Sequence, residues 1–142
     1  MRQLTATLLI AALAACSSST SSEVTATSQN TQTVTQQELG RAFAMKIGES
    51  VTLNDLRLTF RSVEGDSRCP IDAVCVWAGD AEIALKIEQA GKAAVAALHT
   101  TLDPKKTEWN GYTISLVSVS PSKKAATAID PADYRAEILV TR

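Results

Sequence analysis

The chain has a single histidine, few aromatic residues and no cluster of basic side chains. His99 stands alone among 142 residues, and aromatic residues make up 4% of them. A zinc site usually needs four ligands, and a serine nucleophile needs a well-placed histidine base, so neither is expected. Basic and acidic side chains number 14 and 15 without a basic patch, which excludes nucleic-acid binding through clustered positive charge.

The amino terminus, in contrast, carries an export signal. Arg2 precedes the apolar run Leu4–Ala12, and small residues then lead to Cys16. The run is too short to span a bilayer as a permanent helix, and the arrangement is typical of a signal peptide. We therefore expect residues 1–15 to be removed from the mature chain.

Leu13-Ala14-Ala15-Cys16 resembles the lipobox of bacterial lipoproteins. The resemblance implies cleavage before Cys16, fatty acylation of its thiol with chains such as palmitate, and attachment to a membrane of the cell envelope. Two or three acyl chains anchor stably. Ser17 follows where aspartate would favour inner-membrane retention, so we expect an anchor in the outer membrane, in the periplasm or on the cell surface. An ordinary signal peptide that contains a cysteine is the alternative.

A polar segment follows the predicted anchor. Of the 21 residues in 17–37, 17 are Ser, Thr, Gln or Asn, so the segment has too little apolar surface to offset its ordering entropy. We predict a disordered tether over residues 16–40, which would span roughly 25 Å as a flexible coil. An edge strand around Val24–Thr27 is the alternative.

Residues 41–142 show the period-two alternation of strands with one face in water. Apolar residues alternate through Leu56–Arg61 and Trp77–Glu88, and further strands are expected over Tyr112–Val119 and Tyr134–Thr141. The predicted fold is all-β, a small antiparallel β-sandwich of immunoglobulin-like or barrel-like type with six to seven strands. We expect a bulge near residues 115–119 and a polar loop over 103–111.

Cys69 and Cys75 remain once Cys16 is acylated, and an exported domain lies in an oxidising compartment. We predict a Cys69–Cys75 disulfide that staples a turn to a strand beginning at Cys75, with Trp77 on its inward face. A zinc clip and a redox pair are weaker alternatives, because the spacing stands alone and no helix is evident.

The segments Asp66–Pro70 and Cys75–Gly79, together with the later turn Asp130–Tyr134, resemble a pattern found in small, uncharacterised bacterial envelope lipoproteins. The resemblance implies a compact β domain and carries no established activity. Ser67 follows a Gly-Asp pair as in one hydrolase family, but His99 is not preceded by the aspartate that this family requires, so Ser67 is expected to be a turn residue.

We expect a lipid-anchored envelope binding or structural module without catalytic activity, cofactor or metal. Its expected partner is the membrane, through Cys16, and an envelope protein is a further candidate partner. A lipid-anchored inhibitor of an exported protease is the alternative, and it requires the loop 69–75 or that at Trp109 to be exposed. A pocket gathering Asp66, Asp80 and His99 would instead point to an enzyme. The candidate binding residues are Trp109, Tyr112, Arg68 and Asp72.

Overall fold

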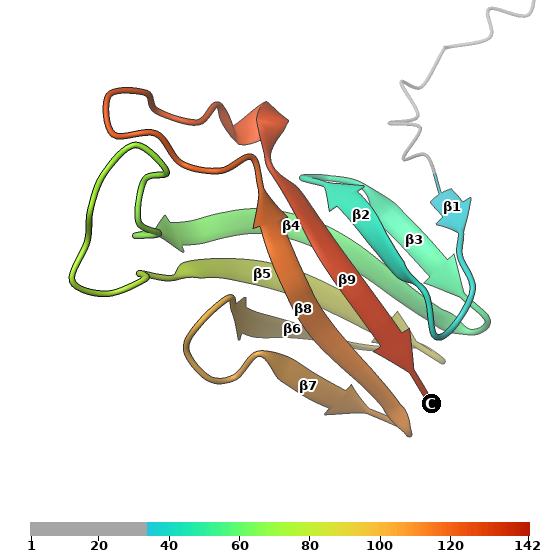
Figure 1. The fold of residues 1–142 in the computed structure, drawn as a ribbon. Helices are drawn as coiled ribbons and strands as arrows, with labels where there is room; N and C mark the ends of the chain where they lie inside the picture. The colour runs from blue at the N-terminus through green and yellow to red at the C-terminus, as the bar shows by residue number, and fades with distance from the viewer. Residues whose placement is uncertain (1–33) are drawn as a thin grey trace, which may run out of the picture. The chain divides into compact units, whose positions relative to one another are not determined.

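The structure is a computed structural model, and it describes residues 34–142. The predicted signal peptide, Cys16 and the possible strand at 24–27 lie outside this range. Nine strands and one short 3-10 helix, η1 (Pro131–Asp133), make up the described chain (Figure 1). The strands are β1 (Val34–Gln36), β2 (Ala42–Lys46), β3 (Ser50–Leu53), β4 (Leu56–Asp66), β5 (Ala81–Gln89), β6 (Lys92–His99), β7 (Lys106–Trp109), β8 (Tyr112–Ser120) and β9 (Arg135–Thr141).

The strands form two sheets, which confirms the predicted all-β sandwich. One sheet has the order β1-β3-β4-β5-β6, and the other has the order β2-β9-β8-β7. All strand pairs are antiparallel except β1 with β3. The described residues contain no helix that is long and apolar enough to cross a membrane.

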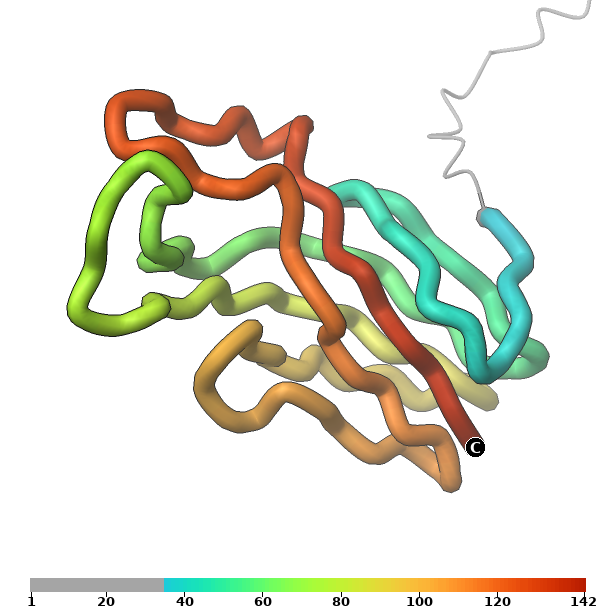
Figure 2. Tube along the Cα trace, viewed as in Figure 1, coloured from blue at the N-terminus to red at the C-terminus, as the bar shows by residue number. Residues whose placement is uncertain are grey.

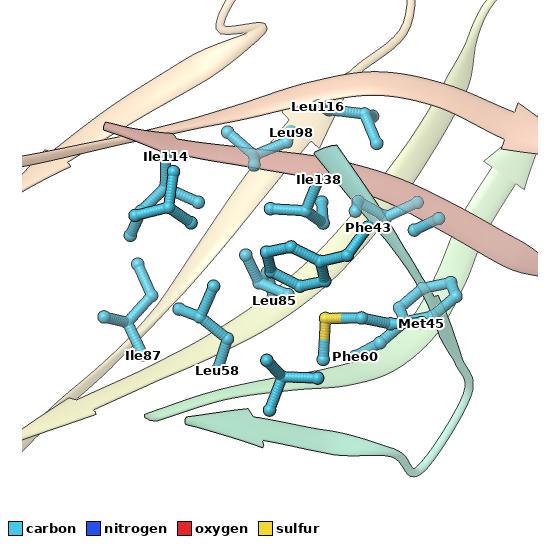
Figure 3. Packing of buried hydrophobic residues seen from close by; sticks show 14 of the residues in the cluster. Phe43, Met45, Leu58, Phe60, Leu85, Ile87, Leu98, Ile114, Leu116 and Ile138 are labelled. Atoms are coloured by element: carbon cyan, nitrogen blue, oxygen red, sulfur yellow. The ribbon is translucent and has the colours of Figure 1, made fainter. Parts of the chain in front are cut away.

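The core lies between the sheets and consists mainly of aliphatic side chains (Figure 3). β5 illustrates its origin, since every second residue from Ala81 to Gln89 is buried while those between are half exposed. The largest fully buried side chains come from both sheets, and they include Phe60, Met45, Leu58, Ile83, Leu85, Ile87, Ile114 and Ile138. Phe43, Phe60 and Tyr112 are the buried aromatic residues, and Leu, Ile and Val supply most of the remaining core.

Two strands were not predicted, and these raise the number to nine. β1 lies within the predicted tether, where Val34–Gln36 pair with Ser50–Thr52. β7 lies within the predicted polar loop, and its four residues pair with β8. The expected bulge is confirmed, because the β8–β9 register shifts between Leu116 and Ser118.

Three two-residue turns lie together at one end of the sandwich. They occupy Asn54–Asp55, Ala90–Gly91 and Asn110–Gly111, and the last two have positive φ at both residues, as type I′ hairpins require. Gln89 donates to Asp55 (2.8 Å) and accepts from Asn110 (2.9 Å), which links the turns. We call this region the turn end.

Candidate binding surface

The opposite end carries the segment of residues 67–80, which we call the cysteine loop. Cys69 and Cys75 form a disulfide with their Cα atoms 6.0 Å apart, so the predicted disulfide is confirmed. The loop closes on itself at its base, because Ser67 N donates to Asp80 O (2.7 Å) and Cys69 N to Ala78 O (2.8 Å). These bonds continue the β4–β5 hairpin past the ends of both strands.

The predicted strand from Cys75 is wrong, because β5 begins only at Ala81. Gly79 is the physical reason: its φ is +69°, in the left-handed region that interrupts a strand. A Cβ atom at this position would lie 1.9 Å from the carbonyl oxygen of Ser67. The base of the cysteine loop can therefore close only around glycine.

Asp80 fixes the base to the β6–β7 connection. Its carboxylate accepts from the backbone N–H groups of Thr101 (2.8 Å) and Leu102 (3.3 Å) and from the Thr100 hydroxyl (3.1 Å). His99 Nδ1 lies 2.7 Å from the other oxygen. Burial alone would raise the pKa of Asp80, but the hydrogen bond with His99 and those from the backbone outweigh it and hold the pKa far below its usual range.

Asp66 fixes the loop to the segment that joins β8 to β9. Arg68 donates to both of its carboxylate oxygens (2.8 and 2.6 Å), and the Tyr134 hydroxyl donates at 2.9 Å. Arg68 also donates to the carbonyl oxygens of Val119 and, at 3.0 Å, Pro121. Burial alone would raise the pKa of Asp66, yet hydrogen bonds from Arg68 and Tyr134 keep it below its usual range.

The cysteine loop and the segment 121–134 therefore lie side by side, as Figure 2 shows. Ile71 N donates to Lys123 O (3.0 Å), and Ala125 N donates to the Asp72 carboxylate (2.8 Å). Lys123 Nζ donates to the backbone oxygen of Asp66 (2.7 Å). The loop is thus held at its base, along one side and across its disulfide.

The far part of the loop, residues 71–77, exposes four apolar side chains, and we call it the tip. Val74 and Val76 are fully exposed at 104% and 103%, and Trp77 is 62% exposed. Ile71 is 67% exposed. The predicted inward position of Trp77 is therefore wrong, because the backbone that carries it is not part of β5. Hydrophobic side chains gathered on an ordered protrusion mark an interaction site more often than scattered ones.

Comparison with protein-family models, with curated proteins and with solved structures finds no match for this chain.

The predicted binding residues are distributed over both ends of the sandwich. Trp109 lies in β7, half buried against the core, and Tyr112 is fully buried with its hydroxyl donating to Asp55 (2.8 Å). Arg68 and Asp72 belong to the cysteine loop, where Arg68 is occupied by its ion pair with Asp66 (2.6 Å) and Asp72 is exposed. The structure thus brings two of the four beside the tip.

Asp80 and His99 meet, but Asp66 joins a different cluster with Arg68 and Tyr134. The Ser67 hydroxyl hydrogen-bonds to the backbone of Asp80 (3.1 Å). Among residues 34–142, no hydroxyl or thiol hydrogen-bonds to the second ring nitrogen of His99, and no three His, Cys, Asp or Glu side chains are grouped for a metal ion. The arrangement positions a loop; it does not assemble a nucleophile with its base.

Ile71 and Val74 lie in the loop 69–75, whose exposure the sequence left open, and Val76 lies in the strand predicted to begin at Cys75, so these tip residues were not predicted as binding residues. A signal was nevertheless available. Gly79 follows two residues after Trp77, and a glycine inside an apparent strand indicates a break or a close backbone approach.

Proposed function

We propose that the protein is a lipid-anchored, non-enzymatic binding module of the bacterial cell envelope, and that the tip of the cysteine loop is its binding surface. The observation that carries the proposal is the exposure of Ile71, Val74, Val76 and Trp77 on a loop that is otherwise held rigidly. An exposed tryptophan flanked by aliphatic residues has the composition of an interface hot spot. A pre-organised loop also loses less conformational entropy when it binds.

The occupant that fits the tip is a protein with an apolar groove. Arg68 in the loop and Lys123 beside it both donate to Asp66, and they are therefore committed to internal bonds. Lys124 is then the one exposed cation of the adjoining segment 121–125, whereas membrane-inserting segments use several free basic residues to hold anionic lipids. Asp72 adds an exposed acidic group within the tip, which further favours a protein over a lipid surface.

The lipid anchor rests on the lipobox-like sequence that ends at Cys16. Replacing Cys16 with Ser in the full chain is expected to abolish labelling by radioactive palmitate and to release the protein from the membrane fraction. Retention of both labelling and membrane attachment in Cys16→Ser would contradict the anchor and leave the tip proposal to be judged separately.

Photo-cross-linking in living cells tests the tip directly. A benzoylphenylalanine at Val76 is expected to yield one discrete protein adduct, and the same residue at Val117, an exposed position on β8, is the matched control. Val74→Asp should abolish the adduct without changing the melting temperature, because Val74 contacts no core residue. Adducts to lipid alone, or equal adducts from both positions, would refute a protein-binding tip.

Inhibition of an exported protease is a second candidate, and the protrusion of the loop favours it. A disulfide-braced segment that projects from a sandwich can enter an active-site cleft, and residues 74–76 are the most exposed part of it. If the Val76 adduct is a protease, the purified full chain should inhibit that enzyme. Val76→Asp should then weaken inhibition by about tenfold or more, on the scale of a hot-spot loss.

A further inference from the structure

The two sheets end in four edge strands, and three of these are guarded against pairing with another chain. β1 has three residues, β2 ends in Lys46, and β7 has four residues that include Lys106 and Glu108. Short strands and charged side chains are the usual means by which proteins protect exposed sheet edges. These three edge strands are therefore protected against pairing with a strand of another chain.

β6 is the exception among the described edges. It has eight residues, and its sequence from Ala93 to Leu98 contains no charge and no proline. Ala93, Val95 and Ala97 are exposed, and Val95 retains 55% of its surface. The β6 edge is thus long, flat and apolar, which are the properties that natural edge strands avoid unless something covers them.

The turn that precedes β6 determines which of its backbone N–H and C=O groups face away from β5. The two-residue turn at Ala90–Gly91 makes Gln89 and Lys92 a hydrogen-bonded pair, so every second residue from Lys92 bonds to β5. Ala93, Val95 and Ala97 consequently direct their backbone N–H and C=O groups away from β5. In the described chain none of the three makes a backbone hydrogen bond beyond the sheet, and the N–H of His99 is taken by Pro104 O (3.0 Å).

We propose that the β6 edge pairs antiparallel with the β6 edge of a second copy of this chain, with Val95 opposite its own counterpart. In this register Ala93 of each copy faces Ala97 of the other. All three outward residues then meet outward residues, and each pair can exchange both of its N–H···O bonds. The same patch serves both partners, as a two-fold interface requires, and the two five-stranded sheets become continuous.

Side-chain chemistry favours a second copy over a foreign peptide. Strand addition gains specificity from pockets that receive alternate side chains of the guest, and alanine at 93 and 97 offers flat surface instead. Lys92, the first residue of β6, lies opposite Leu98 of the other copy in this register. Lys86 and Glu88 on β5 are paired with each other at 2.7 Å and lie one strand behind the edge, so like charges do not oppose each other at the interface.

Cysteine cross-linking tests the register in membranes that contain the full chain. Opposed residues in an antiparallel sheet have Cα atoms about 5.5 Å apart, within the range that a disulfide spans. Val95→Cys should therefore form a disulfide-linked homodimer under mild oxidation, with about tenfold more dimer than Ala93→Cys alone. Ala93→Cys and Ala97→Cys, expressed together under different tags, should form the mixed dimer.

Val117→Cys, on a non-edge position of β8, is the matched control and should remain monomeric. Val95→Lys, combined with Ala93→Cys and Ala97→Cys, should abolish the mixed dimer because like charges would face each other at the centre. Equal cross-linking from 93, 95 and 97, or no dimer from Val95→Cys, would overturn the proposal. Cross-linking of Val95→Cys to a different protein would also overturn it. None of these outcomes depends on what the tip of the cysteine loop binds.

Discussion

The two ends of the sandwich reverse the chain by different means. At the turn end, pairs of residues with positive φ, such as Asn110–Gly111, do so locally, and polar side chains link one turn to the next. At the opposite end, the cysteine loop and the segment 121–134 are long, and buried side chains hold them in place. Backbone geometry is thus sufficient for a two-residue turn, whereas an ordered long loop needs a network at its base.

This difference explains where exposed apolar surface can occur. Asp66, Asp80 and Gly79 order the base of the cysteine loop, so its order does not depend on the side chains of Val74 and Val76. These two side chains are fully exposed and therefore do not stabilise the fold by burial. Their exposure is what the proposed binding role predicts.

Gly79→Ala should produce the largest effect and should affect the loop end alone. Its Cβ would overlap the Ser67 carbonyl, so we expect a loss of about 3 kcal/mol or more in unfolding free energy. Urea denaturation measures the loss, and hydrogen exchange should show opening of residues 66–80. Gly91→Ala at the turn end is the control: its φ is +77° but its Cβ meets nothing within 4 Å, so about 1 kcal/mol is expected. Equal losses would contradict the comparison.

Asp80→Asn should weaken the base of the loop by about 2 kcal/mol at neutral pH, since the N–H groups of Thr101 and Leu102 lose a charged acceptor. The folded pKa of Asp80 lies below its unfolded value of about 3.9. Its ionised form therefore contributes stability that is fully present above that pH and is lost as pH falls through the folded pKa. Unfolding free energy measured from pH 6 downwards should fall more steeply in the wild type than in Asp80→Asn. Parallel curves would contradict this role.

Replacing both Cys69 and Cys75 with Ala should lower the unfolding free energy by about 2 kcal/mol, the scale for closing a short loop. The reason is the gain of conformational freedom in the unfolded chain. Melting temperatures under non-reducing conditions measure the effect. Reduction of the wild type should reproduce it, and equal melting temperatures for variant and wild type would show that the disulfide adds nothing to the base network.

Ala90→Asn should have the smallest effect, and in the stabilising direction. Ala90 has φ +49°, a conformation that costs alanine roughly 1 kcal/mol, and Asn-Gly is the preferred pair for this turn. We expect a gain of about 0.5 kcal/mol in unfolding free energy. A loss of stability would show that the turn end depends on more than backbone geometry.

Much of the sandwich could be predicted because alternation reports directly on which face of a strand is buried. The two strands that were not predicted, β1 and β7, lack a clear alternation of apolar and polar residues. β7 combines Lys106 and Glu108 with a single aromatic residue and therefore looks like a loop, and β1 is hidden in a Ser/Thr/Gln-rich tract. The alternation of apolar residues from Trp77 to Glu88 looks like one continuous strand. Gly79 interrupts it, and only the residues from Ala81 onward form β5.

The candidate site could be predicted only in part, because its geometry depends on contacts that are distant in sequence. The disulfide could be predicted because only Cys69 and Cys75 remain once Cys16 is assigned to the lipid anchor. The bond between Asp66 and Tyr134 joins residues 68 positions apart, and that between Asp80 and His99 crosses from one strand end to another. Neither pair follows a local pattern, although the first and last of the three segments in the envelope-lipoprotein resemblance contact each other through Asp66 and Tyr134.

The separation of base and tip in the cysteine loop has a consequence for how such a protein can change over generations. A substitution at Val74 or Val76 alters what the loop presents while leaving the folding energy almost untouched, whereas one at Gly79 or Asp80 endangers the fold. Related chains should therefore diverge rapidly in the tip and hardly at all in its base. The same property makes Val74 and Val76, on either side of Cys75, natural positions at which to introduce a new recognition sequence while the disulfide is kept.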